Sequence, residues 1–341
     1  MSKKYLFYIS QNYSFEILRP LQKLIRDRGD NCAWFVEGID VNLSNFLNGE
    51  LQLKNIDDVK RYQPCAVFIP GNAVPNFISG LKVQVFHGLE WKKKGHFTIR
   101  GLFDLYCTHG EITTSRFNQL AKQHGNFHVK ETGWPKLDPL FQTTPLELNT
   151  TLPVVLFAPT FSPNLSCAVE CFDEIKRLVN TDRHYWIVKF HPKMKKQWIA
   201  LYQQIVRDNY QIIKADSCLP LLQRADVLVS DTSSIISEFL LLDKPAVTYK
   251  NADPGEYLIN ITQPALLQRS IELALKGSEE LIKQIKLENS KTHPYKDGLS
   301  SQRILDAVDE LIASPVLFEK KKPLNLLRNF KVRSKLNYWR L

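Results

Sequence analysis

The stretch that decides the fold is Ala225-Asp226-Val227-Leu228-Val229-Ser230-Asp231-Thr232-Ser233-Ser234, and a helical pattern follows it from Ile235 to the Lys244-Pro245 pair. The apolar run from Asp226 to Ser230 predicts a buried strand that ends in a polar loop. Ser233 or Ser234 can cap the following helix, whose free N–H groups and dipole favour an anion. A crossover from strand to helix also needs such a cap for structural reasons alone, so this segment leaves both interpretations open.

The same alternation of short apolar runs and longer amphipathic segments extends along the chain and predicts an α/β fold with parallel sheets. In the second half, we expect strands at 154–158, 185–190, 210–213, 226–230 and 246–249. In the first half, we expect them at 5–10, 32–36, 66–69, 82–86, 105–108 and 128–131. These two series predict two Rossmann-like domains with a cleft between them.

A polar stretch at 143–151 and the prolines Pro145 and Pro153 separate the two series of strands. We therefore predict an N-terminal domain at 1–147, a C-terminal domain at 148–315, and a tail at 316–341. The length of 341 residues suits two domains of roughly 150 residues each. The chain shows neither a signal peptide pattern nor a run of 18 apolar residues, so we expect a cytoplasmic protein without a membrane span.

Six scattered cysteines lack the spacing of a zinc site or of a disulfide framework: Cys32, Cys65, Cys107, Cys167, Cys171 and Cys218. Free thiols in a reducing compartment are expected. Cys167 and Cys171 would share one face of a helix, where two thiols without a histidine neighbour are typical of a core. We therefore assign no metal.

The net charge of +10 is concentrated in the tail, because residues 319–341 hold eight Lys or Arg against one acid. Only +3 remains for the other residues, which argues against a nucleic-acid partner. The tail also carries Leu, Phe, Tyr and Trp among its basic residues. This mixture predicts an amphipathic helix on an anionic membrane surface. A tail that packs back on the body is the alternative.

Polar residues follow several predicted strands at the ends where α/β sheets bind ligands. His87-Gly88 follows one strand, and Lys93 lies just beyond it in a run of three lysines. Thr160 and His191 follow two strands of the second half, in addition to Asp231. Histidine, hydroxyl groups and lysine at these ends suit phosphate chemistry, although a lone histidine after a strand is often structural.

Six motifs in order resemble the CDP-glycerol glycerophosphotransferase family, over residues 80 to 312. They are His87-Gly88 with Lys93 and Gly95, Gly133-Trp134-Pro135-Lys136-Leu137-Asp138, Ala158-Pro159-Thr160, His191-Pro192, the segment 225–234 with Glu238 and Lys244-Pro245, and Asp297-Gly298-Leu299-Ser300-Ser301-Gln302-Arg303. The resemblance implies a GT-B-like fold and transfer of an alditol phosphate from a CDP-activated donor to a teichoic-type or capsular polymer. It names no cofactor besides this donor.

The resemblance also implies roles for single residues. His87 falls on the family's essential histidine and is the expected general base, because imidazoles titrate near neutral pH. His191 is the second catalytic candidate. Residues that fall on donor-binding motifs are Thr160, Asp231, Ser233, Ser234, Asp297, Gly298, Ser301 and Arg303. Gly88, Lys93 and Asp138 are acceptor or loop candidates, and Asp138 is equally suited to a capping role.

Leu89, Thr232 and the Phe161-Ser162 pair depart from the family pattern, which leaves the identity of donor and acceptor open. Glycerol and ribitol are both possible alditols, and neither chain elongation nor oligomeric state can be read from the residues. A nucleotide-sugar glycosyltransferase or a UDP-N-acetylglucosamine 2-epimerase-like enzyme of the same fold is the main alternative. A nucleic-acid binder is a weaker alternative, because the body outside the tail is nearly neutral. An inactive scaffold held at the membrane by the tail is also weaker, because both histidines and the phosphate loop are retained.

Overall fold

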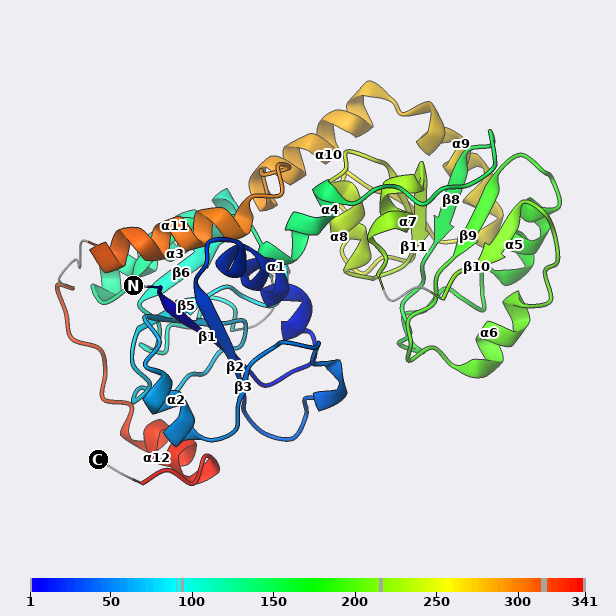
Figure 1. Ribbon diagram of the computed structural model, residues 1–341. Helices are drawn as coiled ribbons and strands as arrows, with labels where there is room; N and C mark the ends of the chain where they lie inside the picture. Colours follow the sequence, from blue (N-terminus) through cyan, green and yellow to red (C-terminus); the bar gives the residue numbers. More distant parts are fainter. Residues whose placement is uncertain (1, 90, 93–94, 215–216, 314–317, 340–341) are drawn as a thin grey trace. The chain divides into compact units, whose positions relative to one another are not determined.

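The computed structural model describes residues 2–89, 91–92, 95–214, 217–313 and 318–339 (Figure 1). The chain forms two compact units. Unit 1 comprises Met1–Phe141 and Lys291–Leu341, and unit 2 comprises Gln142–Ser290. Unit 2 is therefore inserted into unit 1, and the chain passes from one to the other twice. Among the described residues, no helix is long and apolar enough to cross a membrane.

Unit 1 is built on a parallel sheet in the order β3-β2-β1-β4-β5-β6-β7. Its strands are β1 (Lys4–Ile9), β2 (Asn31–Val36), β3 (Gln52–Leu53), β4 (Ala66–Ile69), β5 (Leu81–Gln84), β6 (Leu105–Thr108) and β7 (His128–Glu131). Its helices are α1 (Ser14–Asp27), α2 (Ile56–Tyr62), α3 (Glu111–His124), α11 (Ser300–Ala313) and α12 (Leu326–Lys335), with short 3₁₀ turns at Leu43–Asn45 and Pro135–Leu137. The order reverses between β1 and β4, as in doubly wound nucleotide-binding folds.

Unit 2 repeats this winding in the parallel order β10-β9-β8-β11-β12-β13. Its strands are β8 (Val154–Phe157), β9 (Tyr185–Val188), β10 (Tyr210–Ile212), β11 (Val227–Ser230), β12 (Ala246–Tyr249) and β13 (Ile259–Ile261). Its helices are α5 (Phe172–Val179), α6 (Lys196–Tyr202), α7 (Leu219–Arg224), α8 (Ile235–Leu240) and α9 (Leu267–Lys276), with a 3₁₀ turn at Pro264–Leu266. Helices α4 (Asp138–Gln142) and α10 (Glu279–Thr292) carry the chain across the two unit boundaries.

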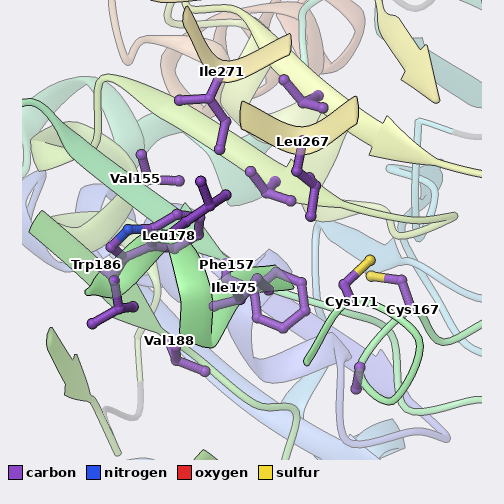
Figure 2. Packing of buried hydrophobic residues seen from close by; sticks show 14 of the residues in the cluster. Val155, Phe157, Cys167, Cys171, Ile175, Leu178, Trp186, Val188, Leu267 and Ile271 are labelled. Atoms are coloured by element: carbon purple, nitrogen blue, oxygen red, sulfur yellow. The ribbon is translucent and has the colours of Figure 1, made fainter. Parts of the chain in front are cut away.

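The predicted α/β class with two Rossmann-like domains is thus confirmed, and all eleven expected strands are present. Two short strands, β3 and β13, have no counterpart in the prediction. Buried apolar side chains explain why the strands form: Val155, Phe157 and Trp186 are fully buried in the unit 2 core. Figure 2 shows Cys167 and Cys171 beside the Phe157 ring in that core. Both thiols are core residues, as predicted.

The predicted domain limits differ from the compact units in one important respect. Residues 291–313 belong to unit 1, whereas the prediction assigned them to the second domain. Helix α11 packs on α1, and its acidic side chains pair with residues from the start of the chain. Asp309 accepts a hydrogen bond from Lys3 Nζ at 2.7 Å, and Arg28 pairs with Asp306 at 3.0 Å. These ion pairs and the apolar face of α11 hold the returning segment on unit 1.

The tail also differs from the prediction, because it packs on unit 1. Tyr338 is 6% exposed in the apolar core, with its ring centroid 4.8 Å from that of Phe77. Lys60 Nζ donates to the Tyr338 hydroxyl at 2.7 Å, and Lys322 pairs with Asp104. One side of the tail therefore docks on unit 1, as in the alternative to a membrane-surface helix.

Candidate active-site residues in the two units

His87 lies in the loop that follows β5 in unit 1, with its side chain exposed. Its Nδ1 lies 3.2 Å from the carbonyl oxygen of Pro70, in the loop that follows β4. A carbonyl oxygen only accepts, so Nδ1 carries the hydrogen of a neutral ring and Nε2 keeps a free lone pair. The ring also stacks on Tyr13, with centroids 5.6 Å apart. His87 is thus held in the tautomer that a general base requires.

The backbone before His87 is strained. Phe86 has φ of 57°, in the left-handed region that bulky side chains rarely occupy. Its ring is buried at 5% exposure and stacks on His96, with centroids 5.1 Å apart. Packing of this ring keeps the unusual turn in place and ends β5 at Gln84, two residues before the predicted end. Strain of this kind often accompanies functional loops, because it fixes the direction of the next side chain.

His191 lies in the loop after β9 in unit 2 and presents the opposite nitrogen. The backbone N–H of Lys193 donates to His191 Nδ1 at 3.1 Å, so the neutral ring carries its hydrogen on Nε2. The ring stacks on Phe161 at 4.3 Å between centroids. Partial burial and the nearby Lys193 and Lys189 lower the pKa of His191 below its usual value. A neutral His191 therefore offers an N–H donor to an anion.

Asp231 follows β11 and is fully buried, so it cannot contact a ligand directly. Its carboxylate accepts backbone N–H groups from Thr160 at 3.0 Å, from Cys167 at 3.0 Å and from Thr232 at 2.7 Å. Burial raises the pKa of this carboxyl group, and the amide hydrogen bonds oppose that shift. Asp231 therefore ties the loop after β8 to the loop after β11, on the two sides of the strand reversal.

Thr160 lies in the loop after β8, and Ser233 and Ser234 lie in the loop after β11 that begins with Asp231. Thr160 and Ser233 are half-buried, and Ser234 is exposed. Helix α8 begins at Ile235 as predicted, but Ser234 precedes it in a helical conformation and its hydroxyl makes no capping hydrogen bond. Ser230 instead donates its hydroxyl to the Ala158 carbonyl at 2.6 Å. In the part of the chain that the structure describes, neither the Ser233 nor the Ser234 hydroxyl makes a hydrogen bond, and the helix is shorter than the sequence pattern predicts.

The last family motif and Asp138 meet inside unit 1. Asp138 is 5% exposed and accepts the backbone N–H groups of Ser300 and Ser301, each at 2.7 Å. Asp138 therefore caps the first turn of α11, and a capping role was one of the two expected for it. Arg303 pairs with Asp297, and its guanidinium lies 3.8 Å from the Tyr295 ring centroid. This pairing lowers the pKa of Asp297.

Two glycines allow the turns of these motifs. Gly298 has φ of 68°, between Asp297 and the start of α11. Gly133 has φ of 78°, and a Cβ there would lie 2.5 Å from the Ser300 hydroxyl oxygen and 2.9 Å from His293 Nε2. No space is therefore left for a side chain at Gly133, where segment 133–138 packs on segment 293–301. Asp297, Gly298, Ser301 and Arg303 all belong to unit 1, whereas Thr160, Asp231 and the two serines belong to unit 2.

The remaining candidates carry less information. Gly88 is half-buried beside His87, with open space where a Cβ would stand. Lys93 lies outside the described residues. Within the described ranges, no group of three His, Cys, Asp or Glu side chains suits a metal ion.

Sequence reasoning missed three residues that shape these loops. Tyr13 stacks on His87 and Phe161 stacks on His191. Asn251, after β12, donates its side-chain amide to the Asp231 carbonyl at 2.6 Å. Phe161 stood out only as a departure from the family pattern. Tyr13 and Asn251 are distant in sequence from the residues that they contact, so no local motif marks them.

Comparison with known proteins gives one sequence relative and two solved structures of similar fold. Over 203 residues, the chain is 27% identical to the teichoic acid glycerol-phosphate primase of Bacillus subtilis strain 168, which covers 53% of this chain and 51% of the relative. The chain thus spans about half the length of that curated relative. The wall teichoic acid polymerase TagF superposes with a TM-score of 0.62 at 14% identity, over 91% of this chain and 89% of TagF. The UDP complex of MnaA from S. aureus gives 0.64 at 16% identity, over 94% and 100%.

These structural likenesses show the fold, which TagF and MnaA share with this chain. One further TagF structure, of a variant soaked with CDPG, superposes with a TM-score of 0.60 at 14% identity, over 92% of this chain and 89% of that one. The family described as CDP-glycerol:poly(glycerophosphate) glycerophosphotransferase matches residues 103–310, which is more than half of the chain. This chain therefore belongs to the CDP-glycerol:poly(glycerophosphate) glycerophosphotransferase family.

Proposed function

We propose that this protein transfers glycerol phosphate, or a related alditol phosphate, from a CDP-activated donor to a hydroxyl group of a lipid-linked, teichoic-type or capsular polymer. Family membership and the likeness to a glycerol-phosphate primase support the reaction class. The observation that carries the proposal is the hydrogen bond from His87 Nδ1 to Pro70, which leaves Nε2 free to take a proton.

The proposed reaction is a single displacement at the β-phosphorus of the donor. The acceptor hydroxyl oxygen forms a bond to this phosphorus, and the bond from phosphorus to the CMP oxygen breaks. His87 Nε2 takes the hydroxyl proton, and CMP leaves with the bonding electron pair. The Nε2–H group of His191 donates to an oxygen of the diphosphate and offsets its developing charge. The donor itself brings the transferred group, so no separate cofactor is needed.

In unit 2, the loops held by Asp231 are proposed to bind the donor diphosphate. Thr160, Ser233 and Ser234 offer hydroxyl groups there, beside the reversal between β8 and β11. Asp231 holds the loops through backbone amides and does not bind the donor itself. The Asp297–Arg303 pair and its neighbours Gly298 and Ser301 stay donor-side candidates of the family motif.

A donor screen tests this function. Purified protein is incubated with membrane extract and either CDP-glycerol or CDP-ribitol, radiolabelled in the alditol. We expect CMP release together with label in polymer for one of these donors, and no turnover of UDP-N-acetylglucosamine. Tighter binding of UDP than of CDP, with transfer or epimerisation of the sugar, would overturn the proposal in favour of a nucleotide-sugar enzyme.

We also propose that the tail holds the enzyme reversibly on the anionic inner face of the cell membrane. Although one side of the tail docks on unit 1, its other side exposes large apolar side chains: Leu324 at 76%, Leu326 at 72%, Leu327 at 83%, Phe330 at 61% and Trp339 at 52%. Basic residues lie between them, and each contributes about 1 kcal/mol near an anionic surface. Apolar side chains flanked by cations suit the headgroup region.

Sedimentation with vesicles of phosphatidylglycerol and phosphatidylcholine tests this partner. Removal of residues 320–341 should release the protein, and salt should weaken binding of the intact chain. Leu327→Asp should also release it. The matched control is Val206→Asp, because Val206 is 86% exposed in unit 2. Equal sedimentation of the two aspartate variants would show that the exposed tail surface does not bind membranes.

A further inference from the structure

A cavity of about 320 Å³ lies in unit 1 at the carboxyl ends of β1, β2 and β4. Ser10 and Gly71 line it from the loops after β1 and β4, where the strand order reverses. Doubly wound sheets bind ligands at such reversals. The tail helix α12 adds Arg328 to the lining, and Arg100 contributes a second guanidinium. The C-terminal segment thus forms part of this cavity, together with the ends of the strands.

The carboxylate in this lining is already neutralised. Glu37 is 8% exposed, accepts the Tyr8 hydroxyl at 2.7 Å, and pairs with Lys335 Nζ at 2.8 Å. Lys335 comes from the same helix as Arg328. Among the described residues, neither Arg328 nor Arg100 has an acidic partner, since Arg100 donates only to the Thr98 carbonyl at 3.3 Å. The cavity therefore carries a net positive charge.

Arg328, which lines the cavity, has one donor that lacks a partner. Its Nη1 atom is buried and has no hydrogen-bond partner among the described residues. A partly buried guanidinium without a counter-charge is costly, so the cavity favours an anion that offsets this charge. A phosphate oxygen meets this need best, because guanidinium groups bind phosphate through parallel N–H donors. Ser10 and Asn72 in the lining offer neutral partners for alcohol groups.

We propose that the unit 1 cavity binds a glycerol phosphate group, with its phosphate on Arg328 and Arg100 and its alcohol groups toward Ser10 and Asn72. The choice of glycerol phosphate among phosphate esters rests on the proposed function. A soluble polyol phosphate, a polymer end and a lipid headgroup all present this chemistry. The tail would then be part of a substrate site as well as a membrane contact.

Calorimetry of the intact protein with sn-glycerol 3-phosphate, in the absence of donor, tests this site. We expect binding of glycerol 3-phosphate and none of glycerol at the same concentration. Arg328→Gln should weaken binding about 10- to 100-fold, because it removes a charged hydrogen-bond donor. Lys331→Gln is the matched control, since Lys331 is exposed on the same helix and loses the same charge. Arg328→Lys should restore part of the affinity.

The result that overturns the inference is equal affinity for glycerol 3-phosphate in Arg328→Gln and Lys331→Gln, with both proteins folded by circular dichroism. Equal binding of glycerol and glycerol 3-phosphate by the parent would do the same. CDP-glycerol turnover measured in parallel separates the two proposals. A parent protein that transfers from CDP-glycerol but shows no affinity for glycerol 3-phosphate keeps its proposed function and loses the cavity site.

Vesicles distinguish the source of the ligand. If a lipid headgroup reaches the cavity, glycerol 3-phosphate should displace the parent from phosphatidylglycerol vesicles but leave Arg328→Gln unaffected. If the ligand is a soluble or polymeric acceptor, vesicle binding should ignore glycerol 3-phosphate while calorimetry still detects it. Both results support the site and assign its ligand.

Discussion

His87 and His191 lie in loops at the carboxyl ends of parallel strands, yet they present opposite nitrogens. In unit 1, Nδ1 of His87 donates to a carbonyl oxygen, and Nε2 is free to accept. In unit 2, Nδ1 of His191 accepts a backbone N–H, and Nε2 carries the hydrogen. The difference teaches that a neighbouring backbone group decides whether a histidine can act as a base or as a donor.

The two units also organise their loops in different ways. Unit 2 uses one buried carboxylate, Asp231, which binds three backbone amides. Unit 1 relies on segments from the end of the chain, since α11 binds Asp138 and the tail helix α12 lines the cavity. The loops of unit 2 are therefore held by a residue of the same contiguous segment. The loops of unit 1 are held by segments from the last 50 residues or so of the given sequence. Each variant described below changes a residue that belongs to one of the two units.

The largest effect is expected for His87→Ala, which removes the proposed base. Loss of a general base lowers a rate by about 10²- to 10⁴-fold, so kcat for CMP release should fall that far. His191→Ala should lower kcat by a smaller factor and also raise KM for the donor, because it removes a hydrogen-bond donor to the diphosphate. His124→Ala is a control on helix α3. If His87→Ala kept more than half of the parent's turnover, the assignment of roles to the two histidines would be wrong.

Asp231→Ala should destabilise unit 2 by about 2–4 kcal/mol, because three backbone amides lose their acceptor at once. Donor affinity should fall with it, since the loop at Thr160 is no longer held. Urea unfolding and calorimetry with CDP-glycerol measure the two effects. Asp231→Asn keeps one carbonyl acceptor and should fall between parent and alanine variant. Unchanged donor affinity in Asp231→Ala would place the diphosphate elsewhere.

Acid should weaken unit 1 through its buried histidines. Burial lowers the pKa of His293 from 6.5 to about 4, while its Nε2 accepts the backbone N–H of Trp134 at 2.9 Å. Between these pH values the unfolded chain binds a proton that the native state does not. The stability present above pH 6.5 is therefore lost as pH falls toward 4, by about 3 kcal/mol for this group.

His293→Gln provides the measurement for this pH dependence. Glutamine keeps an acceptor for Trp134 but does not titrate, so the loss of unfolding free energy between pH 7 and pH 4 should shrink. Urea unfolding across this range gives the slopes. The same slope in parent and variant would mean that His293 does not contribute to acid sensitivity.

The smallest effect concerns the tail. Tyr338→Ala removes the ring that packs on Phe77 and the acceptor for Lys60, so the tail should detach and be cleaved by protease about tenfold faster. Trp339→Ala is the neighbouring control, because Trp339 is 52% exposed. Equal cleavage rates in the two variants would show that Tyr338 does not hold the tail on unit 1.

Local sequence pattern was enough to predict the strands and the positions of the polar loops. Apolar runs such as Val154–Phe157 are fully buried between helices, and short buried strands leave a clear signal. The polar residues after them follow from the geometry of parallel sheets. The pattern therefore predicted four residues correctly as loop residues: His87, Thr160, His191 and Asp231.

What the pattern could not predict depends on partners distant in sequence. The amphipathic pattern of α11 fits any apolar surface, so it did not reveal that this helix returns to α1. The tautomers depend on Pro70 and Lys193, which contact the rings through backbone atoms and leave no mark in residue type. The burial of Asp231 and the docking of Tyr338 likewise rest on a few specific contacts without periodicity.

The return of α11 to unit 1 has a consequence for the order of folding during synthesis. All residues of unit 2 are contiguous, so this unit can fold as soon as Ser290 has left the ribosome. Unit 1 has its seven strands by Phe141, but Lys3 and Arg28 wait for Asp306 and Asp309, which are made only after unit 2. Contacts of such long sequence separation form slowly. We therefore expect the unit that begins second to be completed first.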